Sequence, residues 1–302
     1  MSDKTLVLGS GVSALAYLFY NPSSFALAGD QVGGLFANAK NLGPQYVWKT
    51  SSTTKLMRDL GLNWGTKTIR VGYAVQGEFL EKKKVSPDSM KAIRRMYSMK
   101  TRGVEPKESH MSDGKASFEI YDISVSELVK ILIDRVSLRI YYHKATNVLA
   151  YDKEVRADDG RTWGYSTLVS TIPAPRLLDL MGCDEEKVKL VAWDKAYVVE
   201  KATGEFAKDF IASGFDYAYI AGEEMQAHRV KRVDESTVLW EYTMKPGGFA
   251  VAPGEGVVIQ KGGQIIGGHE VLNSLPKSVE LLGRYSEWSH GVRLEDVLEK
   301  IQ

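Results

Sequence analysis

The stretch Leu6-Val7-Leu8-Gly9-Ser10-Gly11-Val12-Ser13-Ala14 decides the fold that we expect for this chain. It joins an apolar run, a Gly-x-Gly-x-x-Ala turn and the first residues of a helix. Such a turn lets backbone N–H groups approach a pyrophosphate, which then lies at the N-terminus of the helix. Glycine-rich turns also form for steric reasons alone. The motif indicates dinucleotide binding because a predicted strand precedes it and a predicted helix follows it. We predict a strand at 5–8, a helix at 12–20, and dinucleotide contacts from Gly9, Ser10, Gly11, Val12, Ser13 and Ala14.

The composition is that of an ordinary globular protein. The 302 residues are 44% hydrophobic and 25% charged, enough for one large domain or two intertwined ones. A net charge of +1 provides no overall attraction to nucleic acid or to a membrane. The single cysteine, Cys183, excludes an intrachain disulfide, and no stretch reads as a signal peptide or a membrane span. We therefore expect a cytoplasmic protein with no membrane partner.

Periodicity and turn residues predict the remaining elements. We expect a second parallel strand at 25–28 and a hairpin within 69–79. Strands at 147–151 and 154–157 are expected to flank a turn at Asp158-Asp159-Gly160, and 190–268 is expected to be mostly strand. The remaining predictions are helices at 50–60, from Ser86-Pro87-Asp88 to about Met99, at 124–136 and at 177–181, and strands at 139–142 and 167–171.

Two further segments strengthen the dinucleotide reading. Gly33-Gly34 lets the backbone pass close to a large planar or phosphate ligand, although a flexible turn would read the same way. A second segment, Val169-Ser170-Thr171-Ile172-Pro173, forms the carboxyl end of an expected strand. Ligands of open α/β sheets bind at the carboxyl ends of the strands.

The second strand departs from the usual dinucleotide pattern. An acidic residue normally binds the adenosine ribose there, but Leu27 occupies its place and Asp30 follows three residues later. Either Asp30 substitutes through a changed loop, or backbone groups and water bind the ribose.

Together these motifs resemble the flavoproteins that include amine oxidases, protoporphyrinogen oxidase, phytoene desaturase-like enzymes and UDP-galactopyranose mutase. The matching residues are Gly9, Gly11, Ala14, Asp30, Gly33, Gly34, Ser170, Thr171, Pro173, Gly283 and Arg284. Leu42-Gly43-Pro44 and the segment up to Leu60-Gly61-Leu62 also look like this family. The resemblance implies FAD, with contacts that extend to Val148, Thr171 and Pro173.

Gly283-Arg284-Tyr285, followed by Trp288, is most similar to the mutase branch. By resemblance, Gly283 and Arg284 lie near the flavin or its phosphates, where a guanidinium suits phosphate oxygens. The alternative is a surface arginine after a core strand.

The family resemblance also implies a domain organisation. We expect an α/β fold in which a Rossmann-like FAD domain comprises 1–50, 118–178 and 275–302. A mostly β substrate domain would comprise 51–117 and 179–274. A second Gly-x-Gly-x-x-Gly is missing from the sequence, so we expect no separate NAD(P)H domain, and oxygen could reoxidise the flavin.

The substrate side is less distinctive. Tyr217 and Tyr219 share one strand face, as do Trp240 and Tyr242, and could form an aromatic wall or simply core. The family often places a substrate-facing arginine in a segment like that of Arg229. The candidate substrate contacts are Arg229, Tyr219, Trp240, Tyr242 and Trp288.

The segment from Glu81 to Arg102 is strongly basic. It carries eight cations, Lys82 to Arg102, against two acids. It could bind phosphates of a nucleotide or of DNA, or form a solvated helix face. The five histidines show no metal-ligand spacing, so we expect no metal, and no catalytic residue can be named.

These observations favour an FAD-dependent oxidoreductase that oxidises an amine C–N bond by hydride transfer to flavin N5. The substrate would be a small or nucleotide-linked amine. Three alternatives stay open: a flavoenzyme for an amino-modified base in DNA, as in phage thymidine hypermodification; a mutase-like isomerase that uses reduced flavin; and a non-catalytic flavin-fold binding module.

Overall fold

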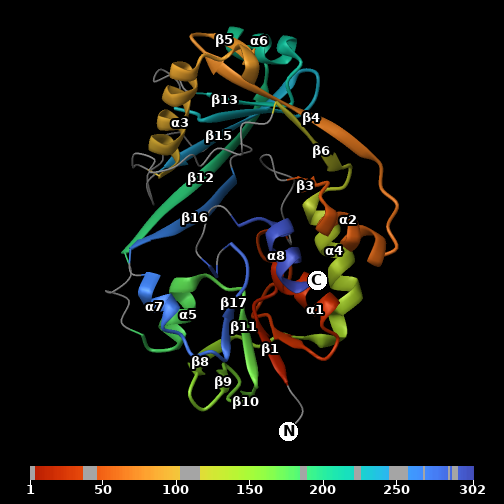
Figure 1. The fold of residues 1–302 in the computed structure, drawn as a ribbon, viewed down its shortest axis with the longest axis vertical. Coiled ribbons are helices and arrows are strands. Elements are labelled where there is room, and N and C mark those ends of the chain that lie inside the picture. Colours follow the sequence, from red (N-terminus) through yellow and green to blue (C-terminus); the bar gives the residue numbers. More distant parts are fainter. Residues whose placement is uncertain are drawn as a thin grey trace.

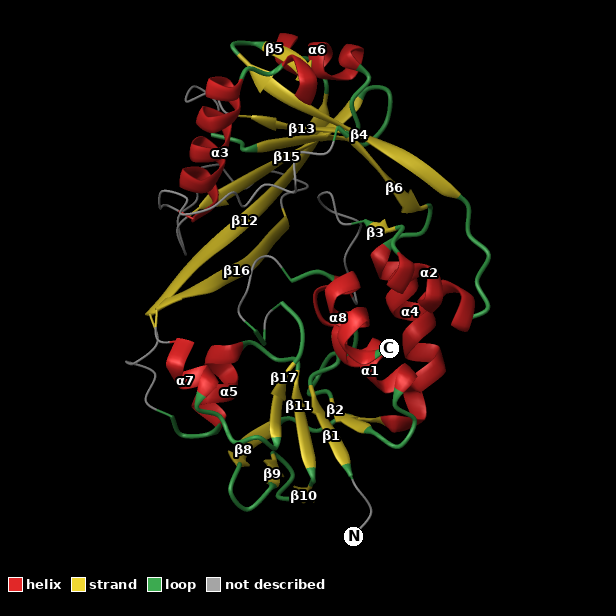
Figure 2. Cartoon of the chain, viewed as in Figure 1, coloured by secondary structure: helices red, strands yellow, loops and turns green. Residues whose placement is uncertain are grey.

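The structure is a computed structural model in which two lobes are connected by long strands (Figure 1). It describes residues 4–36, 46–102, 116–183, 189–220, 226–244, 258–267, 269–284, 286–287 and 292–302. Figure 2 shows one lobe that mixes helices with short parallel strands and a second lobe dominated by long strands. No helix among these residues is long and apolar enough to cross a membrane.

The first lobe is built on a five-stranded parallel sheet with the order β17-β11-β1-β2-β7. Its strands come from widely separated parts of the chain: β1 (Thr5–Leu8), β2 (Phe25–Leu27), β7 (Ile140–Tyr141), β11 (Thr167–Ser170) and β17 (Val279–Leu281). The central strand β1 is buried on both faces because helices cover one face and a small antiparallel sheet covers the other.

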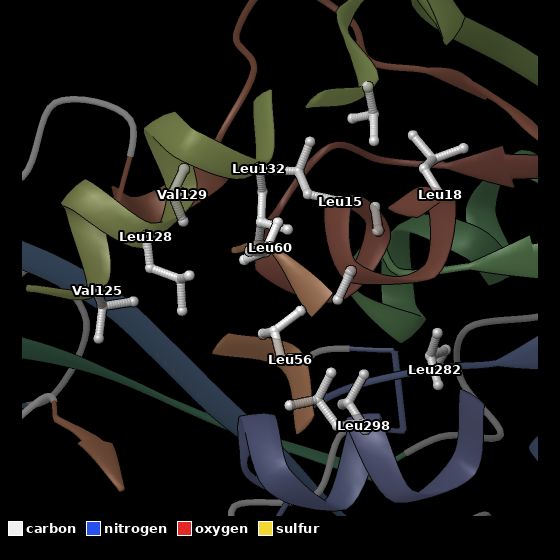
Figure 3. Close-up of a cluster of buried hydrophobic side chains, with 14 of the residues drawn as sticks. Leu15, Leu18, Leu56, Leu60, Val125, Leu128, Val129, Leu132, Leu282 and Leu298 are labelled. Carbon is white, nitrogen blue, oxygen red and sulfur yellow. The ribbon is translucent and has the colours of Figure 1, made fainter. Parts of the chain in front are cut away.

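Three helices cover the first face: α1 (Val12–Tyr20), α4 (Val125–Val136) and α8 (Leu294–Ile301), with α2 (Ser51–Asp59) packed on α8. Figure 3 shows their leucines and valines meeting in one cluster, including Leu15, Leu56, Leu128 and Leu298. On the second face lie β8 (Ala145–Leu149), β9 (Glu154–Ala157), β10 (Thr162–Gly164) and α5 (Ala174–Leu180). The C-terminal helix is therefore part of the core around the N-terminal strand.

The second lobe is a nine-stranded mixed sheet with the order β16-β12-β15-β14-β13-β4-β6-β3 and β5 paired to β4. Its strands are β3 (Val47–Trp48), β4 (Thr66–Val75), β5 (Glu78–Glu81), β6 (Ser117–Tyr121), β12 (Lys189–Lys201), β13 (Tyr217–Ile220), β14 (Arg229–Arg232), β15 (Thr237–Met244) and β16 (Val258–Gly267).

Each face of this sheet carries one helix. Met90 and Ile93 of α3 (Pro87–Arg102) pack on the face that bears Tyr217 and Tyr219, while α6 (Glu205–Ser213) packs on the opposite face. The short elements are α7 (His269–Asn273) and three 3₁₀ turns, η1 (Gly34–Phe36), η2 (Lys82–Lys84) and η3 (Ser137–Arg139).

Most of the predicted elements are confirmed, including the opening strand, turn and helix. Three are corrected. The turn at Asp158–Gly160 connects β9 to β10 and not β8 to β9. Helix α5 begins at Ala174 because Pro175 suits its first turn. Helix α6 interrupts the stretch expected to be strand, between Gly204 and a left-handed Gly214 that ends it.

The expected domain boundaries stay a prediction. The packing of α2 on α8 places Ser51–Asp59, assigned to the substrate domain, beside the helices of the first lobe.

Candidate functional site

The opening glycine turn contacts both β2 and the segment that follows β11. The N–H of Gly9 donates to the carbonyl of Leu27 at 2.9 Å. Gly9 has φ of +105°, and a Cβ placed on it would lie 2.5 Å from Thr171 Oγ1. Thr171 is fixed in turn because its hydroxyl donates to the carbonyl of Leu8 at 2.9 Å. A side chain at position 9 would therefore disrupt the contact between the turn after β1 and the segment after β11.

The second glycine of the motif faces open space. Gly11 is the N-cap residue of α1, and a Cβ on it would meet no atom of the structure within 4 Å. No side chain among the described residues caps α1, and its first turn, Val12-Ser13-Ala14, contains no acid. The first N–H groups of α1 and the positive end of its dipole are thus oriented to receive an anion.

Gly33 and Gly34 lie close to the opening glycine turn, although they follow β2 in the chain. Gly33 donates from its N–H to the carbonyl of Ser10 at 2.8 Å, and a Cβ on Gly34 would lie 3.2 Å from Gly11 Cα. The hydroxyl of Ser10, which is nearly buried, donates to the carbonyl of Gln31 at 2.9 Å. A side chain at position 34 would therefore press against the backbone of Gly11, so the two glycine-containing turns lie close together. We call these turns, with Gly9, Gly11, Gly33 and Gly34, the glycine cradle, because such an arrangement is expected around a phosphate.

The C-terminal segment reaches the same turn. Leu282 donates from its N–H to the carbonyl of Ser170 at 2.9 Å, which directs the chain across the end of β11. Gly283 has φ of +94°, and a Cβ there would clash with Ser13 Oγ in the first turn of α1. Its neighbour Arg284 is exposed. Both ends of the chain thus meet at the N-terminus of α1; Tyr285 and Trp288 lie outside the described residues.

The strand end that usually carries the ribose-binding acid is apolar here. Leu27 is 3% exposed and packs in the same core as Val148, which is itself buried in β8. Gly29, with φ of +53°, donates from its N–H to the carbonyl of His143 at 3.2 Å, and Asp30 follows it. The side chain of Leu27 therefore belongs to the core, and the ribose contact of Asp30 stays a prediction.

Pro173 is the N-cap residue of α5. It follows Thr171 and Ile172 in the segment between β11 and α5.

A buried charged cluster, which we call the Glu241 cluster, lies in the sheet of the second lobe. Glu241 on β15 is 1% exposed. Its Oε1 lies 2.5 Å from Lys195 Nζ on β12 and 3.3 Å from Nε2 of the fully buried His228. Its Oε2 accepts from Arg229 Nε on β14 at 2.8 Å and also from Arg229 Nη2. One carboxylate therefore connects three strands.

Burial and mutual repulsion shape the protonation of the cluster. Burial acts to raise the pKa of Glu241, but Arg229, Lys195 and His228 hold it well below its ordinary value. Burial lowers the pKa of His228 to about 4, so this imidazole is neutral at pH 7. Burial also lowers the pKa of Lys195; Glu241 opposes that shift, while Arg229 and Arg284 add to it. The effect of Arg284 on Lys195 indicates that the cluster lies within electrostatic range of the C-terminal segment.

Strand register places the cluster on the same sheet face as two of the predicted aromatics. Tyr219, Arg229, Glu241 and Tyr197 are cross-strand partners in one row. The guanidinium carbon of Arg229 lies 5.8 Å from the ring centre of Tyr219 and 6.0 Å from that of Tyr217, within reach of a cation–π contact. Arg229 and Tyr219 thus lie together, and their contact with a substrate stays a prediction.

Trp240 and Tyr242 lie on the opposite face, against α6. The ring centre of Trp240 lies 5.9 Å from that of Phe206, and its Nε1 donates to Glu200 Oε1 at 2.6 Å. The four aromatics therefore do not form one wall, because residues that alternate along a strand point to opposite faces. The candidate residues predicted from the sequence did not include Lys195, His228 or Glu241. A glutamate inside the apolar run Val238-Leu239-Trp240-Glu241-Tyr242 was the signal that could have indicated them.

Two cavities among the described residues lie away from both features. One of about 500 Å³ is lined by Lys49, Thr50, Ser51, Thr54, Lys55, Arg58 and Glu119, and one of about 290 Å³ lies between β8 and α7. Neither is lined by the glycine cradle or by the Glu241 cluster. The candidate functional site therefore consists of the glycine cradle and the Glu241 cluster, and it includes neither cavity.

In the part of the chain that the structure describes, one group of side chains has the spacing of metal ligands. His143, Asp158 and Asp159 place ligand atoms within 4.8 Å of one another. Arg161 already contacts two of them, with Nη1 3.4 Å from His143 Nε2 and Nε 3.1 Å from Asp159 Oδ2. A guanidinium in this position competes with a cation, and the expected absence of a metal stays a prediction.

Solved structures share this fold over almost the whole chain. A reduced UDP-galactopyranose mutase matches with a TM-score of 0.71 at 12% identity, covering 98% of this chain and 93% of the other. An oxidoreductase from Methanosarcina mazei matches with a TM-score of 0.64 at 11% identity and 98% coverage of both chains. Putrescine oxidase bound to putrescine matches with a TM-score of 0.61 at 10% identity, covering 98% and 96%.

At these identities the likeness concerns the fold. It confirms the α/β fold with a parallel sheet, and it confirms at the level of fold the resemblance to the amine oxidase and mutase flavoproteins. No protein-family model matches the sequence, and no curated protein matches it.

Proposed function

We propose that this chain binds FAD and acts as a flavin-dependent oxidoreductase. The observation that carries the proposal is the glycine cradle at α1, where Gly9, Gly11, Gly34 and Gly283 bring both ends of the chain to one uncapped helix N-terminus. The residues fit a dinucleotide: the space in front of Gly11 is open, and α1 directs N–H groups and positive dipole toward it. The fold shared with a reduced mutase and with putrescine oxidase supports the same reading.

Residues of the first lobe would bind the cofactor, and residues of the second lobe would bind the substrate. The N–H groups of α1 and the backbone of Gly33-Gly34 would hold the pyrophosphate, and Arg284 would bind a phosphate or ring oxygen. The isoalloxazine ring of bound FAD would supply the redox chemistry by accepting a hydride. Arg229 and Lys195, whose side chains are each 14% exposed, would bind and orient the substrate.

We propose more specifically that the substrate is an amine oxidised at its C–N bond. The substrate would lose a hydride from the carbon next to nitrogen and a proton from the nitrogen, giving an imine that water hydrolyses. Oxygen would take the electrons afterwards, since the sequence lacks a second dinucleotide motif.

An absorption spectrum tests the cofactor directly. We expect the purified protein, alone or after incubation with FAD and gel filtration, to show bound flavin. A protein that takes up no FAD would contradict the proposal and favour a binding module of degenerate flavin fold. Anaerobic mixing with a broad amine panel should then bleach the flavin; no bleaching by any amine would rule out the amine substrate.

An exposed basic segment favours a second candidate, action on an amino-modified base in DNA. Lys83, Lys84, Lys91 and Arg94 are exposed on η2 and α3, and α3 packs on β13 and β15, which carry Tyr219 and Glu241. Phosphates bound along this segment would bring a nucleic acid beside the Glu241 cluster.

Duplex binding at several salt concentrations tests this candidate. We expect tight, salt-sensitive binding whose log–log slope decreases in magnitude by up to about 2 in the double variant Lys84→Gln/Lys91→Gln. Lys208→Gln on α6, on the opposite sheet face, is the matched control. A slope unchanged in the double variant would exclude the basic segment as the DNA contact.

A further inference from the structure

We propose that the cavity of about 500 Å³ beside α2 binds the phosphate group of a small molecule. This cavity, which we call the α2 cavity, is lined by three cations, three hydroxyl side chains and one acid. Its lining contains no residue of the glycine cradle or of the Glu241 cluster. The inference therefore concerns a second ligand site and does not rest on the proposed function.

Helix α2 provides one wall of the cavity. Its apolar face includes Leu56, which is fully buried in the core of the first lobe. Its opposite face lines the cavity with residues at the spacing i, i+3, i+4 and i+7, which are Ser51, Thr54, Lys55 and Arg58. A solvated helix face would show the same spacing, so the inference depends on the second wall.

The second wall comes from the sheet of the other lobe. Lys49 follows β3 directly, and Glu119 lies in β6, the strand paired with β3. The N–H of Lys49 donates to the carbonyl of Glu119 at 3.0 Å, and Lys49 Nζ lies 3.3 Å from both carboxylate oxygens of Glu119. The cavity thus lies where the two lobes meet, between strands of one lobe and a helix packed on α8 of the other (Figure 1).

The charges around the cavity favour an anion. Its lining carries Lys49, Lys55 and Arg58 against Glu119 alone. Asp59 lies outside the lining and is shared by two of these cations, at 3.6 Å from Lys55 Nζ and 3.4 Å from Arg58 Nε. Three cations therefore face two acids among the described residues, which makes the potential in the cavity positive.

The donors of the cavity suit phosphate oxygens. The guanidinium of Arg58 presents a planar fork that can bind two oxygens of one phosphate, and Lys55 adds an ammonium. Tyr121 donates its hydroxyl to Thr54 Oγ1 at 2.8 Å, so the hydrogen of Thr54 is left to bond with a further acceptor. The first turn of α2 contains no acid, so its dipole adds to the attraction.

The size of the cavity indicates a phosphate ester. A volume of about 500 Å³ lies within the range of small-molecule pockets and exceeds what a free phosphate needs. An organic group attached to the phosphate, such as a sugar, would fill the remainder. Such a ligand would contact both lobes and would stabilise the folded chain, because the unfolded chain has no such cavity.

Titration calorimetry on the FAD-loaded protein tests the site, because bound FAD occupies the glycine cradle. A preparation that takes up no FAD is titrated as purified. The probes are ribose 5-phosphate, ribose as its neutral counterpart, and inorganic phosphate. We expect ribose 5-phosphate to bind with a Kd of about 1 mM or lower, and ribose not to bind. Weaker binding of inorganic phosphate would indicate that the ligand is an ester, and equal binding would indicate free phosphate.

Charge-removing variants locate the binding site. We expect Lys55→Gln/Arg58→Gln to weaken ribose 5-phosphate at least about tenfold. Lys67→Gln is the matched control, because Lys67 is an exposed cation on β4 that pairs with Asp122 at 2.6 Å and does not line the cavity. The control should bind as the wild type does. Equal affinities of the double variant and the control would overturn the inference.

A second pair of variants leaves all the cations in place. Thr54→Glu introduces a negative charge into the cavity, whereas Thr54→Gln introduces a side chain of the same size without charge. We expect both to fold by circular dichroism, with ribose 5-phosphate retained by the glutamine variant and lost by the glutamate variant. Binding that is equally tight in both would place the phosphate elsewhere and overturn the inference.

The outcomes separate this inference from the proposed function. If ribose 5-phosphate does not bind, the inference is overturned even in a protein that takes up FAD. A protein that takes up no FAD but binds ribose 5-phosphate through Lys55 and Arg58 overturns the flavin proposal and supports the α2 cavity as a site.

Discussion

Replacing Gly9 or Gly11 by alanine should have opposite consequences: the first should lower stability, and the second should weaken FAD binding. At Gly9, alanine meets both a left-handed φ of +105° and Thr171 Oγ1 at 2.5 Å, so we expect the free energy of unfolding to fall by about 1–3 kcal/mol. At Gly11 nothing in the structure lies within 4 Å, so alanine should change stability by less than about 1 kcal/mol. It should nevertheless weaken FAD at least about tenfold, because its methyl group would occupy the phosphate space.

Urea unfolding and FAD titration of the two alanine variants check this pair. If Gly11→Ala bound FAD as tightly as the wild type, the pyrophosphate would have to lie elsewhere.

His228 makes stability depend on pH. Its pKa is about 4 in the fold, against 6.5 when unfolded, so the unfolded chain binds more protons between these values. The free energy of unfolding should therefore increase as pH rises from about 4 to about 6.5, and change little from this source above that range. The full effect is at most about 3 kcal/mol.

The variant His228→Gln isolates this contribution, because Glu241 and Lys195, whose pKa values are also shifted, face the same imidazole. We expect a shallower dependence in the variant, measured by urea unfolding at several pH values. Equal slopes in both proteins would show that His228 is already protonated in the fold.

Among the elements, α8 connects the C-terminus to the dinucleotide lobe. Leu298 is fully buried in the core shared by α1, α2 and α4, whereas its neighbour Glu299 is exposed. We expect Leu298→Ala to lower the free energy of unfolding by about 2–4 kcal/mol, and Glu299→Ala to change it little. Equal effects from chemical denaturation would mean that α8 does not pack as described.

Element prediction succeeded where local pattern suffices. The helix expected at 124–136, with Leu128, Val129, Leu132 and Ile133 on one face, is α4, and the structure has Ser124 as its N-cap. Helix α6 was missed because it lies in a stretch expected to be mostly strand, although Phe206, Ala207, Phe210 and Ile211 have the spacing of one helix face. Its apolar face packs with Phe215 and with the sheet in one hydrophobic cluster.

For the whole molecule, FAD should couple distant parts of the chain. The cradle takes residues from 9–34, from Thr171 and from Gly283, so the unfolded chain has no such site. At about 100 times its Kd, FAD should raise the free energy of unfolding by about 2.7 kcal/mol.

A chain that ends at residue 282 should retain no FAD although the opening motif is intact. Gel filtration followed by an absorption spectrum checks this expectation. Flavin retained by the truncated chain would contradict the joining of the two ends.

The sequence by itself determined the glycine turn, the strand and helix around it, the replacement of the ribose acid by Leu27, and the flavoprotein-like fold. These features depend on residues close together in the chain, or on an ordered set of motifs. Only the tertiary structure assembled Lys195, His228, Arg229 and Glu241, and assigned Tyr219 and Trp240 to opposite faces of the sheet. The physical reason is that the face of a residue and its partners depend on strand order and register, which pairings between remote segments decide.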